Sequence, residues 1–342
     1  MEDRRQFLIR ALLTSAAFAT GAVPAWAHRG EYPLGKFIDS APYRELLAEL
    51  SAIHGFDKRE LTWLFSRVRI QPTIAELYER PPERWSYDRY RRRVINGRII
   101  ALGRAYLRKH RSLFDSIEAE YGVDGAVIAA ILGVESRFGR NTGGFRVFDA
   151  LNTLLATVPR REAFARDELV AFMLLCRDAG FEPLHIRGSY AGAMGAPQFV
   201  PSSYRRYAVD YDRDGRADLW RSTDDIVASV ARYLQAHGWR LGAPIRVPVT
   251  ADVDDHMVRE WLDQGIKGDI LVSTLLESGV AWAGDPVPIE TDANVSLLTY
   301  RWEGDDRPVA AFANFRALLH YNRSVNYVLA VTDLAEALQA NV

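Results

Sequence analysis

Residues 124 to 139 of the chain read DGAVIAAILGVESRFG. The run 126–134 within this stretch is apolar at every position, which is typical of a helix that is buried on most sides. Asp124 directly precedes the run and is predicted to cap this helix at its N-terminus. Glu135 ends the run, where its neighbours desolvate the carboxylate and the negative end of the helix dipole faces it. Both effects favour the protonated form of Glu135.

A glutamate that keeps its proton near neutral pH has the property that a general acid requires. The structural alternative is a Glu135 that turns outward or pairs with Arg137 or Arg140. For an isolated glutamate near a helix end, that alternative would be favoured. The other segments of the chain therefore decide between the two interpretations.

Helical periodicity extends outward from this stretch. Between Ser40 and about Leu132, apolar residues recur at spacings of three and four. Between Ala243 and about Ala311 the pattern changes to alternation and to residues that favour strands, and helical spacing returns from Phe312. The sequence therefore predicts a mainly helical α+β protein with a small β subdomain inserted near the C-terminus.

Composition and charge argue against a nucleic-acid-binding protein and against sites built from cysteine. The chain has 342 residues, with 43 Lys and Arg against 44 Asp and Glu, and a formal net charge of -1. No global basic field is available to bind nucleic acid, so we predict no nucleic-acid partner. The one cysteine, Cys176, excludes an intramolecular disulfide and a thiolate metal site.

Residues 1–27 have the features of an export signal. Arg4-Arg5 precedes a mildly apolar stretch that ends in Ala25-Trp26-Ala27, which is typical of a signal peptide with its cleavage site. The arginine pair resembles a twin-arginine signal, although such pairs also occur in ordinary secretory signals. The apolar stretch is marginal in length for a transmembrane helix. We predict a periplasmic protein without a permanent membrane anchor.

A calcium-type loop follows at residues 210–221. Its residues fit the pattern D-x-D-x-D-G-x-x-D, and oxygen ligands in this order suit Ca²⁺. The candidate ligands are Asp210, Asp212, Asp214, the backbone carbonyl of Arg216, and Asp218. Position 12 is Arg221 instead of the usual Glu, so Asp224, Asp225 or water would have to compensate. The alternative is an acidic turn that binds no metal; we expect a structural Ca²⁺ and no cofactor for the chemistry.

Five segments together closely resemble the lytic murein transglycosylase B family. They are GVESRFG (133–139), PRR (159–161), GSYAGAMG (188–195), QFVPSSY (198–204) and YNRS (321–324). Their order and spacing match the family, and the resemblance extends from about Tyr43 to about Ala337. It implies a lysozyme-like catalytic core, a mainly helical fold and peptidoglycan glycan strands as the partner. Protein partners stay unknown.

The resemblance implies a reaction that needs one glutamate, here Glu135. Glu135 would protonate the glycosidic oxygen between N-acetylmuramic acid and N-acetylglucosamine and would then take the proton of the muramoyl C6 hydroxyl. That hydroxyl attacks its own anomeric carbon, so the product is a 1,6-anhydro end. The acetamido carbonyl of the substrate can stabilise the developing cation, so a second carboxylate is not required.

Asp149 is the candidate for a second carboxylate. Its simplest role is to cap the helix that follows it. If Asp149 lay across a cleft from Glu135, a hydrolytic muramidase would be the alternative function. A third possibility, from another class, is a calcium-stabilised protein that binds peptidoglycan without turnover.

The remaining site residues come from the resemblance. It implies a substrate contact for Ser189 and a place in the cleft for Gln198, although Gln198 could equally satisfy a buried backbone group. The small residues around Gly188, Gly192 and Gly195 are interpreted as room for a glycan chain. Pro197 stands where the family often has Gly.

Aromatic and basic residues complete the predicted site. Tyr233, Tyr321 and Tyr327 are candidates for stacking on sugar rings, although without the family alignment each would be a core residue. The Asn322 amide would bind the acetamido group or orient Glu135, and its alternative is a capping or turn residue. Arg160 and Arg161 would bind peptide or lactyl carboxylates.

These inferences divide the chain into five predicted regions. They are the signal peptide 1–27, a helical region 28–120, the catalytic core 121–242 with its loop 210–221, the β subdomain 243–311, and a C-terminal helix in 312–342 that packs on the core.

Overall fold

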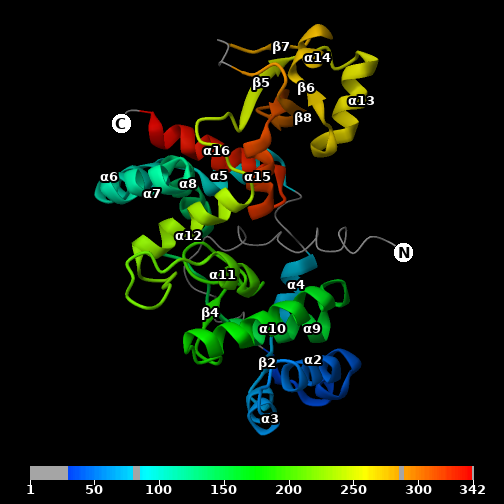
Figure 1. Cartoon of the computed structure of the whole chain (residues 1–342). Coiled ribbons are helices and arrows are strands. Elements are labelled where there is room, and N and C mark those ends of the chain that lie inside the picture. Colours follow the sequence, from blue (N-terminus) through cyan, green and yellow to red (C-terminus); the bar gives the residue numbers. More distant parts are fainter. Residues whose placement is uncertain (1–29, 80–84, 285–288, 341–342) are drawn as a thin grey trace. The chain divides into compact units, whose positions relative to one another are not determined.

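The computed structural model describes residues 30–79, 85–284 and 289–340 (Figure 1). The predicted signal peptide lies outside the described residues. The chain divides into two compact units. Unit 1 comprises Met1–Pro82 and Ile131–Val230, and unit 2 comprises Glu83–Ala130 and Ala231–Val342. The boundaries of the five predicted regions stay a prediction.

Unit 1 is built mainly from helices around a central helix pair. The elements are η4 (Gly35–Asp39), α2 (Ala41–Ala52), α3 (Lys58–Ser66), α4 (Pro72–Glu79), α9 (Val147–Thr157), η6 (Pro159–Arg161), α10 (Glu162–Ala179) and α11 (Pro201–Tyr207). Two short antiparallel ladders join β1 (Tyr32–Pro33) to β2 (Arg69–Ile70) and β3 (Phe145–Arg146) to β4 (Arg187–Gly188).

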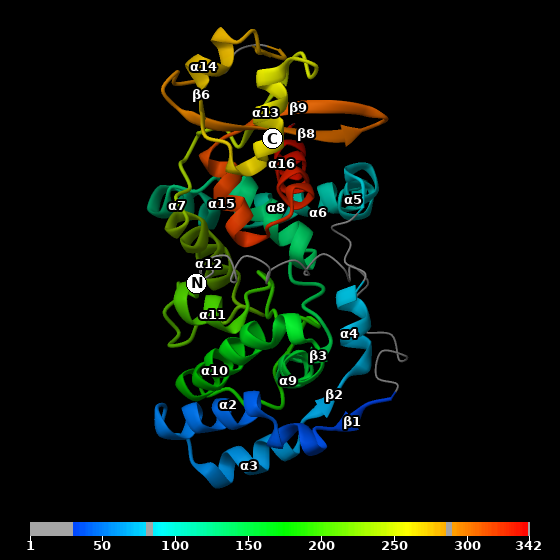
Figure 2. The ribbon, with the colours of Figure 1, turned by 90° about the vertical axis from the view of Figure 1, so that its right-hand side faces the viewer.

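The helices α9 and α10 form the centre of unit 1. The Phe148 and Phe172 rings stack between them, with centroids 6.1 Å apart. Figure 2 shows α2 and α3 together on one side of this pair. The Tyr43 hydroxyl of α2 donates to the backbone carbonyl and the Oδ1 of Asn152, both at 3.0 Å, which fixes α2 on α9. Apolar packing and these buried hydrogen bonds therefore fix the helices that precede and follow the candidate site.

The helix α8 (Gly125–Ser136) begins in unit 2 and ends in unit 1. The run from Ala126 to Leu132 is 7% exposed or less at every position, so the prediction of a helix buried on most sides is confirmed. Asp124 directly precedes the helix, as predicted, and its Oδ2 accepts a hydrogen bond from Trp239 Nε1 at 3.0 Å. A deeply buried helix therefore leads to Glu135.

Unit 2 contains a second group of helices. They are α5 (Tyr87–Val94), α6 (Gly97–Lys109), α7 (Arg111–Tyr121), α15 (Ala313–Tyr321) and α16 (Val325–Gln339), together with the end of α12 (Thr223–Ala236). In α16 the run from Val328 to Val331 is fully buried, and Asp333 accepts hydrogen bonds from Tyr87 and Arg91, both at 2.6 Å. The predicted single helix after residue 312 is instead the pair α15 and α16, because the chain is extended at Asn322 and Ser324.

A five-stranded antiparallel sheet completes unit 2, in the order β6-β8-β9-β5-β7. Its strands are β5 (Arg246–Thr250), β6 (Ile270–Leu271), β7 (Ala281–Trp282), β8 (Asn294–Trp302) and β9 (Asp305–Ala311), with α13 (His256–Gln264), η7 (Gly265–Lys267) and α14 (Val272–Glu277) between them. Val247, Val249 and Leu297 pack with Trp261 and Leu275 into a separate apolar core. The predicted fold class, mainly helical α+β with a small sheet near the C-terminus, is confirmed.

Candidate active site

Glu135 lies in the last turn of α8 in unit 1. Its exposed fraction is 6%, and its neighbours Val134 and Ser136 are 7% and 1% exposed. Leu132, one turn earlier, is fully buried. The carboxyl group is therefore largely removed from water, which disfavours its ionised form.

The backbone leaves the helical conformation at Arg137, two residues after Glu135. Arg137, Phe138 and Gly139 have φ angles of 53°, 60° and 78°, so three successive residues adopt the left-handed conformation. The Phe138 N–H donates to the Leu132 carbonyl at 2.9 Å, and the Gly139 N–H donates to Ser136 Oγ at 2.9 Å. Left-handed backbone is costly for Arg and Phe, and such conformations cluster at functional sites. The turn ends α8 directly after the candidate acid.

Asp149 does not cap the helix that begins beside it, so that prediction is wrong. Arg146 occupies the capping position of α9, and the Asp149 carboxylate lies in the first turn. Asp149 Oδ2 accepts from Arg146 Nε at 2.7 Å, and its Oδ1 accepts from Arg146 Nη2 at 2.7 Å and from the Arg69 N–H at 2.9 Å. The carboxylate instead ties α9 to β2 through the Arg69 N–H, while the guanidinium at i−3 binds both of its oxygens.

The glycine-rich segment 188–199 folds against the protein itself. A Cβ at Gly188 would lie 2.1 Å from the Ala193 carbonyl oxygen, and a Cβ at Gly192 would lie 2.6 Å from Leu151 Cδ2. At Gly195 the obstacle is the Leu219 carbonyl oxygen, at 2.6 Å. The interpretation that these glycines leave room for a glycan chain is therefore wrong, because protein atoms already fill the space beside them.

Ser189 and Gln198 both lie in this segment. Ser189 is half-buried, and its Oγ accepts from the backbone N–H groups of Ala191 and Ala193 at 3.2 and 3.0 Å, so its hydroxyl hydrogen remains available for donation. Gln198 Nε2 donates to the carbonyls of Gly195 and Thr142 at 2.8 and 3.2 Å. These bonds agree with the structural alternative for Gln198, while its place in a substrate cleft stays a prediction.

The two candidate arginines differ in exposure. Arg160 and Arg161 lie in η6, directly before α10 begins at Glu162. Arg160 is exposed, whereas Arg161 is 7% exposed and its guanidinium carbon lies 5.8 Å from the Phe164 ring centroid. Arg160 is therefore the more accessible of the two to an anionic ligand.

The remaining predicted contacts belong to unit 2, where they cluster around α15. The Tyr233 hydroxyl donates to the His320 carbonyl at 2.6 Å, and the Tyr233 and Tyr321 rings meet edge to face at 4.8 Å. Tyr327 is fully buried and stacks 6.4 Å from Tyr321, so it has no exposed ring face for a sugar. Asn322 is 1% exposed and accepts the Ser324 N–H at 3.1 Å, as its turn alternative predicts.

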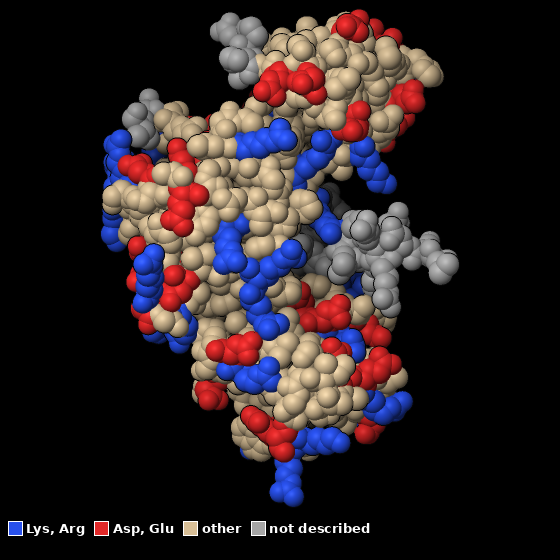
Figure 3. Space-filling model, in the orientation of Figure 1, with Lys and Arg blue, Asp and Glu red and all other residues tan. Residues whose placement is uncertain are grey.

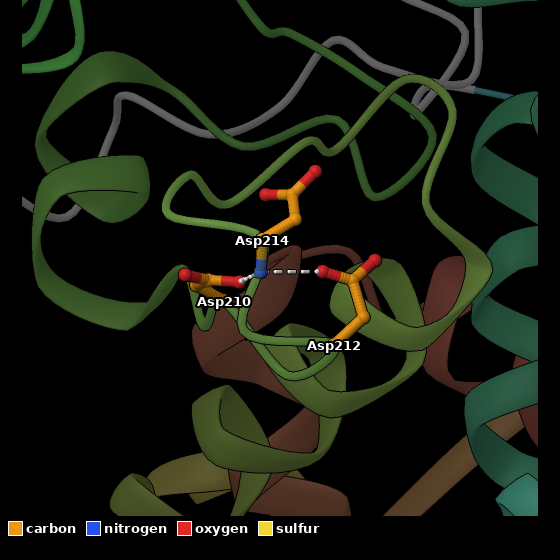
Figure 4. A group of neighbouring side chains, drawn as sticks. All are labelled: Asp210, Asp212 and Asp214. Atoms are coloured by element: carbon orange, nitrogen blue, oxygen red, sulfur yellow. Dashed lines mark hydrogen bonds between the residues drawn. The ribbon is translucent and has the colours of Figure 1, made fainter.

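The acidic loop between α11 and α12 lies in unit 1. Carboxylate oxygens of Asp210, Asp212 and Asp214 all lie within 4.8 Å of one another (Figure 4). The Asp214 N–H donates to Asp210 Oδ1 at 3.1 Å and to Asp212 Oδ1 at 3.2 Å. The structure thus brings together three of the four predicted carboxylate ligands.

Asp218 and Asp225 hold the shape of this loop. Asp218 Oδ1 accepts the N–H groups of Trp220 and Arg221 at 2.9 and 3.1 Å. Asp225 is fully buried and accepts the N–H groups of Tyr211 and Asp218, both at 2.7 Å. These bonds occupy the two carboxylates with backbone donors, so they organise the loop around the three clustered aspartates.

The sequence patterns did not single out a buried glutamate of α10, Glu168. Glu168 is 6% exposed, and its two oxygens accept from the Ser202 N–H at 2.9 Å and the Ser202 hydroxyl at 2.6 Å. Burial raises its pKa to about 7, and the Ser202 bonds oppose this shift. Its position beside the apolar run Leu169–Cys176 was a sequence signal of burial. Glu168 joins α10 to the first turn of α11.

None of the helices in residues 30–79, 85–284 and 289–340 is both long enough and apolar enough to cross a membrane.

Comparisons with known proteins agree on one family. The model of the family described as "Transglycosylase SLT domain" matches residues 39–336. Membrane-bound lytic murein transglycosylase B of Escherichia coli strain K12 is 31% identical over 314 residues, which are 89% of this chain and 84% of that protein. The chain is thus similar to a murein-cleaving enzyme over most of both lengths.

Solved structures give the same result. The soluble lytic transglycosylase SltB1 of Pseudomonas aeruginosa has a TM-score of 0.80 and 35% identity, over 86% of this chain and 97% of that chain. Escherichia coli lytic transglycosylase Slt35, solved with calcium, has a TM-score of 0.80 and 31% identity, over 90% and 95%. Pseudomonas aeruginosa SltB3, solved with NAG-NAM-pentapeptide, has a TM-score of 0.77 and 29% identity, over 87% and 79%.

The family match covers most of the chain, and the relatives share its fold. The predicted resemblance and the predicted enzyme class are confirmed. The chain therefore belongs to the transglycosylase SLT domain family and is a lytic transglycosylase.

Proposed function

We propose that the chain cleaves the β-1,4 bond between N-acetylmuramic acid and N-acetylglucosamine in peptidoglycan, with Glu135 as its one acid and base. The observation that carries this proposal is the burial of Glu135, 6% exposed, at the end of an apolar helix. A carboxyl group in such a place is favoured in the protonated form, which is the form that a leaving group needs.

Glu135 first donates its proton to the glycosidic oxygen as the bond from that oxygen to the anomeric carbon breaks. N-acetylglucosamine leaves with a free C4 hydroxyl, and the acetamido carbonyl of the muramoyl residue stabilises the positive charge at the anomeric carbon. The ionised Glu135 then accepts the proton of the muramoyl C6 hydroxyl, whose oxygen bonds to that carbon. Glu135 regains its proton, the product is a 1,6-anhydro end, and no water is consumed.

The surroundings of Asp149 support a mechanism with one carboxylate. A hydrolytic muramidase with two carboxylates needs a second group that can activate water. Both oxygens of Asp149 are engaged by Arg146, and one of them also accepts the Arg69 N–H. These three bonds make Asp149 a poor candidate for a base, so we favour attack by the C6 hydroxyl over attack by water.

We assign substrate contacts to residues that the family motifs mark. In unit 1, Ser189 has a hydroxyl hydrogen to donate, and exposed Arg160 suits a lactyl or peptide carboxylate. Gln198 and Arg161 stay weaker candidates, because the structure already uses Gln198 Nε2 for backbone carbonyls and buries Arg161. In unit 2 the candidates are Tyr233, Tyr321, Asn322 and, with the weakest support, the fully buried Tyr327.

The loop 210–221 is proposed to hold a structural Ca²⁺. Three clustered carboxylates fit a hard cation that prefers oxygen ligands, and the Arg216 carbonyl and Asp218 are the further predicted donors. Slt35, a relative of this chain, was solved with calcium. The Ala196 N–H donates to the Leu219 carbonyl at 2.7 Å, so the loop is bonded to the segment that carries Ser189 and Gln198. A bound Ca²⁺ would neutralise the repulsion among the three aspartates and stabilise this wall of unit 1.

The proposed substrate implies export. Peptidoglycan lies outside the cytoplasmic membrane, and the features of residues 1–27 support passage to the periplasm through a twin-arginine or a general secretory signal. N-terminal sequencing of the protein isolated from the periplasm tests this part. A mature chain that starts at His28 is the expected result.

Product analysis tests the reaction itself. Purified sacculi are digested with the mature protein, and the fragments are identified by mass spectrometry. We expect muramoyl ends that carry the 1,6-anhydro ring, and we expect Glu135→Gln to release none above background. Reducing muramoyl ends as the main product would contradict the proposal and favour the hydrolytic alternative.

A further inference from the structure

A pocket of about 490 Å³ opens in unit 1 beside the turn that follows Glu135. Three segments line it: the turn, through Gly139 and Thr142; the segment that leads into β4, through Phe181 and residues 185–187; and the second half of the acidic loop, through Arg216, Asp218, Trp220 and Arg221. None of the site residues predicted from the family motifs lines it, apart from Arg216 and Asp218 of the metal loop.

Basic side chains dominate this pocket. Arg187, Arg216 and Arg221 line it together with one acidic residue, Asp218. Basic and acidic side chains are mixed over the face that Figure 3 shows, in keeping with the net charge of -1. Among the side chains that line the pocket, three guanidinium groups against one carboxylate are an excess of positive charge, which favours an anion inside it.

Protein contacts anchor two of the three guanidinium groups, and all three groups keep N–H donors that can bind a ligand. Arg187 Nη1 donates to the Gly144 carbonyl at 2.6 Å, which leaves its other nitrogens to bind a ligand. Arg216 is anchored over the Phe181 ring at 5.0 Å and lies 3.4 Å from Asp218. Among the described residues, the Arg221 guanidinium forms no hydrogen bond or ion pair. An incoming anion would therefore find two guanidinium groups, those of Arg187 and Arg216, already positioned, which lowers the entropy lost on binding.

One wall of the pocket is apolar and rigid. Phe181 and Trp220 meet edge to face with centroids 5.7 Å apart, and both rings also contact Tyr204 of α11. The Tyr204 hydroxyl donates to the Ala217 carbonyl, which fixes this part of the loop on α11. A ligand that combines a carboxylate with small apolar groups would match both the guanidinium groups and this wall.

We propose that this pocket binds a carboxylate of the stem peptide that peptidoglycan carries on its muramoyl residues. The assignment rests on the proposed function, because it takes the substrate from there. Guanidinium groups bind carboxylates through paired hydrogen bonds, whereas neutral sugar hydroxyls gain little from an excess of positive charge. Stem peptides have both carboxylates and alanine methyl groups. The related SltB3 was solved with NAG-NAM-pentapeptide, so a relative binds a ligand of this class.

The position of the pocket links it to the reaction. Gly139 lies four residues after Glu135, at the end of the left-handed turn, and Thr142 accepts a hydrogen bond from Gln198. A peptide held here would therefore fix the muramoyl residue relative to the turn that follows Glu135. The pocket makes this lytic transglycosylase selective for strands that still carry their peptides.

Isothermal titration calorimetry tests the proposal on the full mature chain with Glu135→Gln, so that the ligand is not cleaved. The probes are NAG-NAM-pentapeptide and the same disaccharide without its peptide. We expect the pentapeptide ligand to bind more tightly than the bare disaccharide. Arg221→Gln should weaken binding of the pentapeptide ligand about tenfold and should leave the affinity for the bare disaccharide unchanged. Arg301→Gln, at an exposed arginine of β8, is the matched control and should change neither affinity.

Two further probes identify the group that is bound. A pentapeptide ligand whose carboxylates are converted to amides should bind no more tightly than the bare disaccharide. Added salt should weaken binding of the unmodified pentapeptide ligand. Equal binding of the amidated ligand, or full affinity after both Arg221→Gln and Arg187→Gln, would overturn the proposal. So would inorganic phosphate if it competed as strongly as the peptide. Because binding is read without turnover, failure here is distinct from failure of the reaction proposed for Glu135, which the digestion products report.

Discussion

The end of α8 and the helix pair α9 and α10 both bury carboxyl groups, but the structure uses them differently. Glu135 and Glu168 are each 6% exposed, and Asp149 is 3% exposed. Asp149 ties α9 to β2 through Arg146 and the Arg69 N–H, and Glu168 ties α10 to α11 through Ser202. Glu135 instead lies where a helix stops and three left-handed residues begin. Burial alone therefore does not separate the proposed catalytic acid, Glu135, from the structural carboxylates; the left-handed backbone that follows it does.

The largest expected effect comes from exchanging the two buried glutamates for glutamine. Glu135→Gln should lower the rate of murein cleavage by about 10²–10⁴-fold, the usual contribution of a general acid, with an unchanged melting temperature. Glu168→Gln should keep its rate within about twofold, because an amide can accept from the Ser202 N–H and donate to its hydroxyl. Turbidity clearing of sacculi and circular dichroism measure the two quantities. Equal losses of rate in both variants would remove the distinction between the two regions.

The next effect concerns the stability of α9. Asp149→Asn should lower the free energy of unfolding by about 3 kcal/mol, because it leaves Arg146, 24% exposed, without its charge partner. Asp178→Asn is the matched control: its ion pairs are about half exposed and should contribute less than about 1 kcal/mol. Urea denaturation measures both. If the wild type and Asp178→Asn produced reducing muramoyl ends and Asp149→Asn did not, Asp149 would instead have a role in catalysis.

The third effect is a dependence of stability on pH that resides in α10. The pKa of Glu168 is about 7, against 4.5 for an ordinary Glu. Because the folded state holds this proton more tightly than the unfolded state, protonation adds stability as pH falls through 7 toward 4.5. The contribution should amount to about 2.5 kcal/mol between pH 8 and pH 5. The free energy of unfolding of the wild type should rise by this amount between pH 8 and pH 5 relative to that of Glu168→Gln. If the two proteins gave parallel profiles of unfolding free energy against pH, Glu168 would be ionised at neutral pH.

The smallest effect is expected at the exposed aspartates of the loop. Calcium at ten times its dissociation constant should stabilise the protein by about 1.4 kcal/mol and raise its melting temperature by a few degrees. Asp212→Asn should abolish this increase, and a chelator should reverse it while the rate constant of the folded enzyme stays within about twofold. A large loss of rate at a temperature where the protein remains folded would contradict a purely structural metal.

Local patterns predicted the parts of the fold that depend on neighbouring residues. The apolar run before Glu135 predicted a buried helix, the alternation after Ala243 predicted the small sheet, and the loop spacing brought Asp210, Asp212 and Asp214 together. In each case periodicity or spacing within a short segment determines the geometry.

Contacts between distant segments were not predictable in this way. Asp149 binds the backbone of Arg69, 80 residues earlier, and this bond overrides the capping role that local sequence favoured. A Cβ at Gly143 would lie 2.2 Å from the Gly188 backbone, so the glycines serve packing between segments instead of access for a ligand. The basic pocket likewise joins three segments, and no single one of them carries its charge pattern.

The central claim is that the C6 hydroxyl of the substrate, and not water, attacks the anomeric carbon after Glu135 has donated its proton. Digestion of sacculi in water enriched in ¹⁸O tests this claim directly, because the attacking oxygen stays in the muramoyl product. The account predicts muramoyl ends without ¹⁸O, as mass spectrometry would show. Incorporation of one ¹⁸O atom at the anomeric carbon of newly formed ends would contradict it.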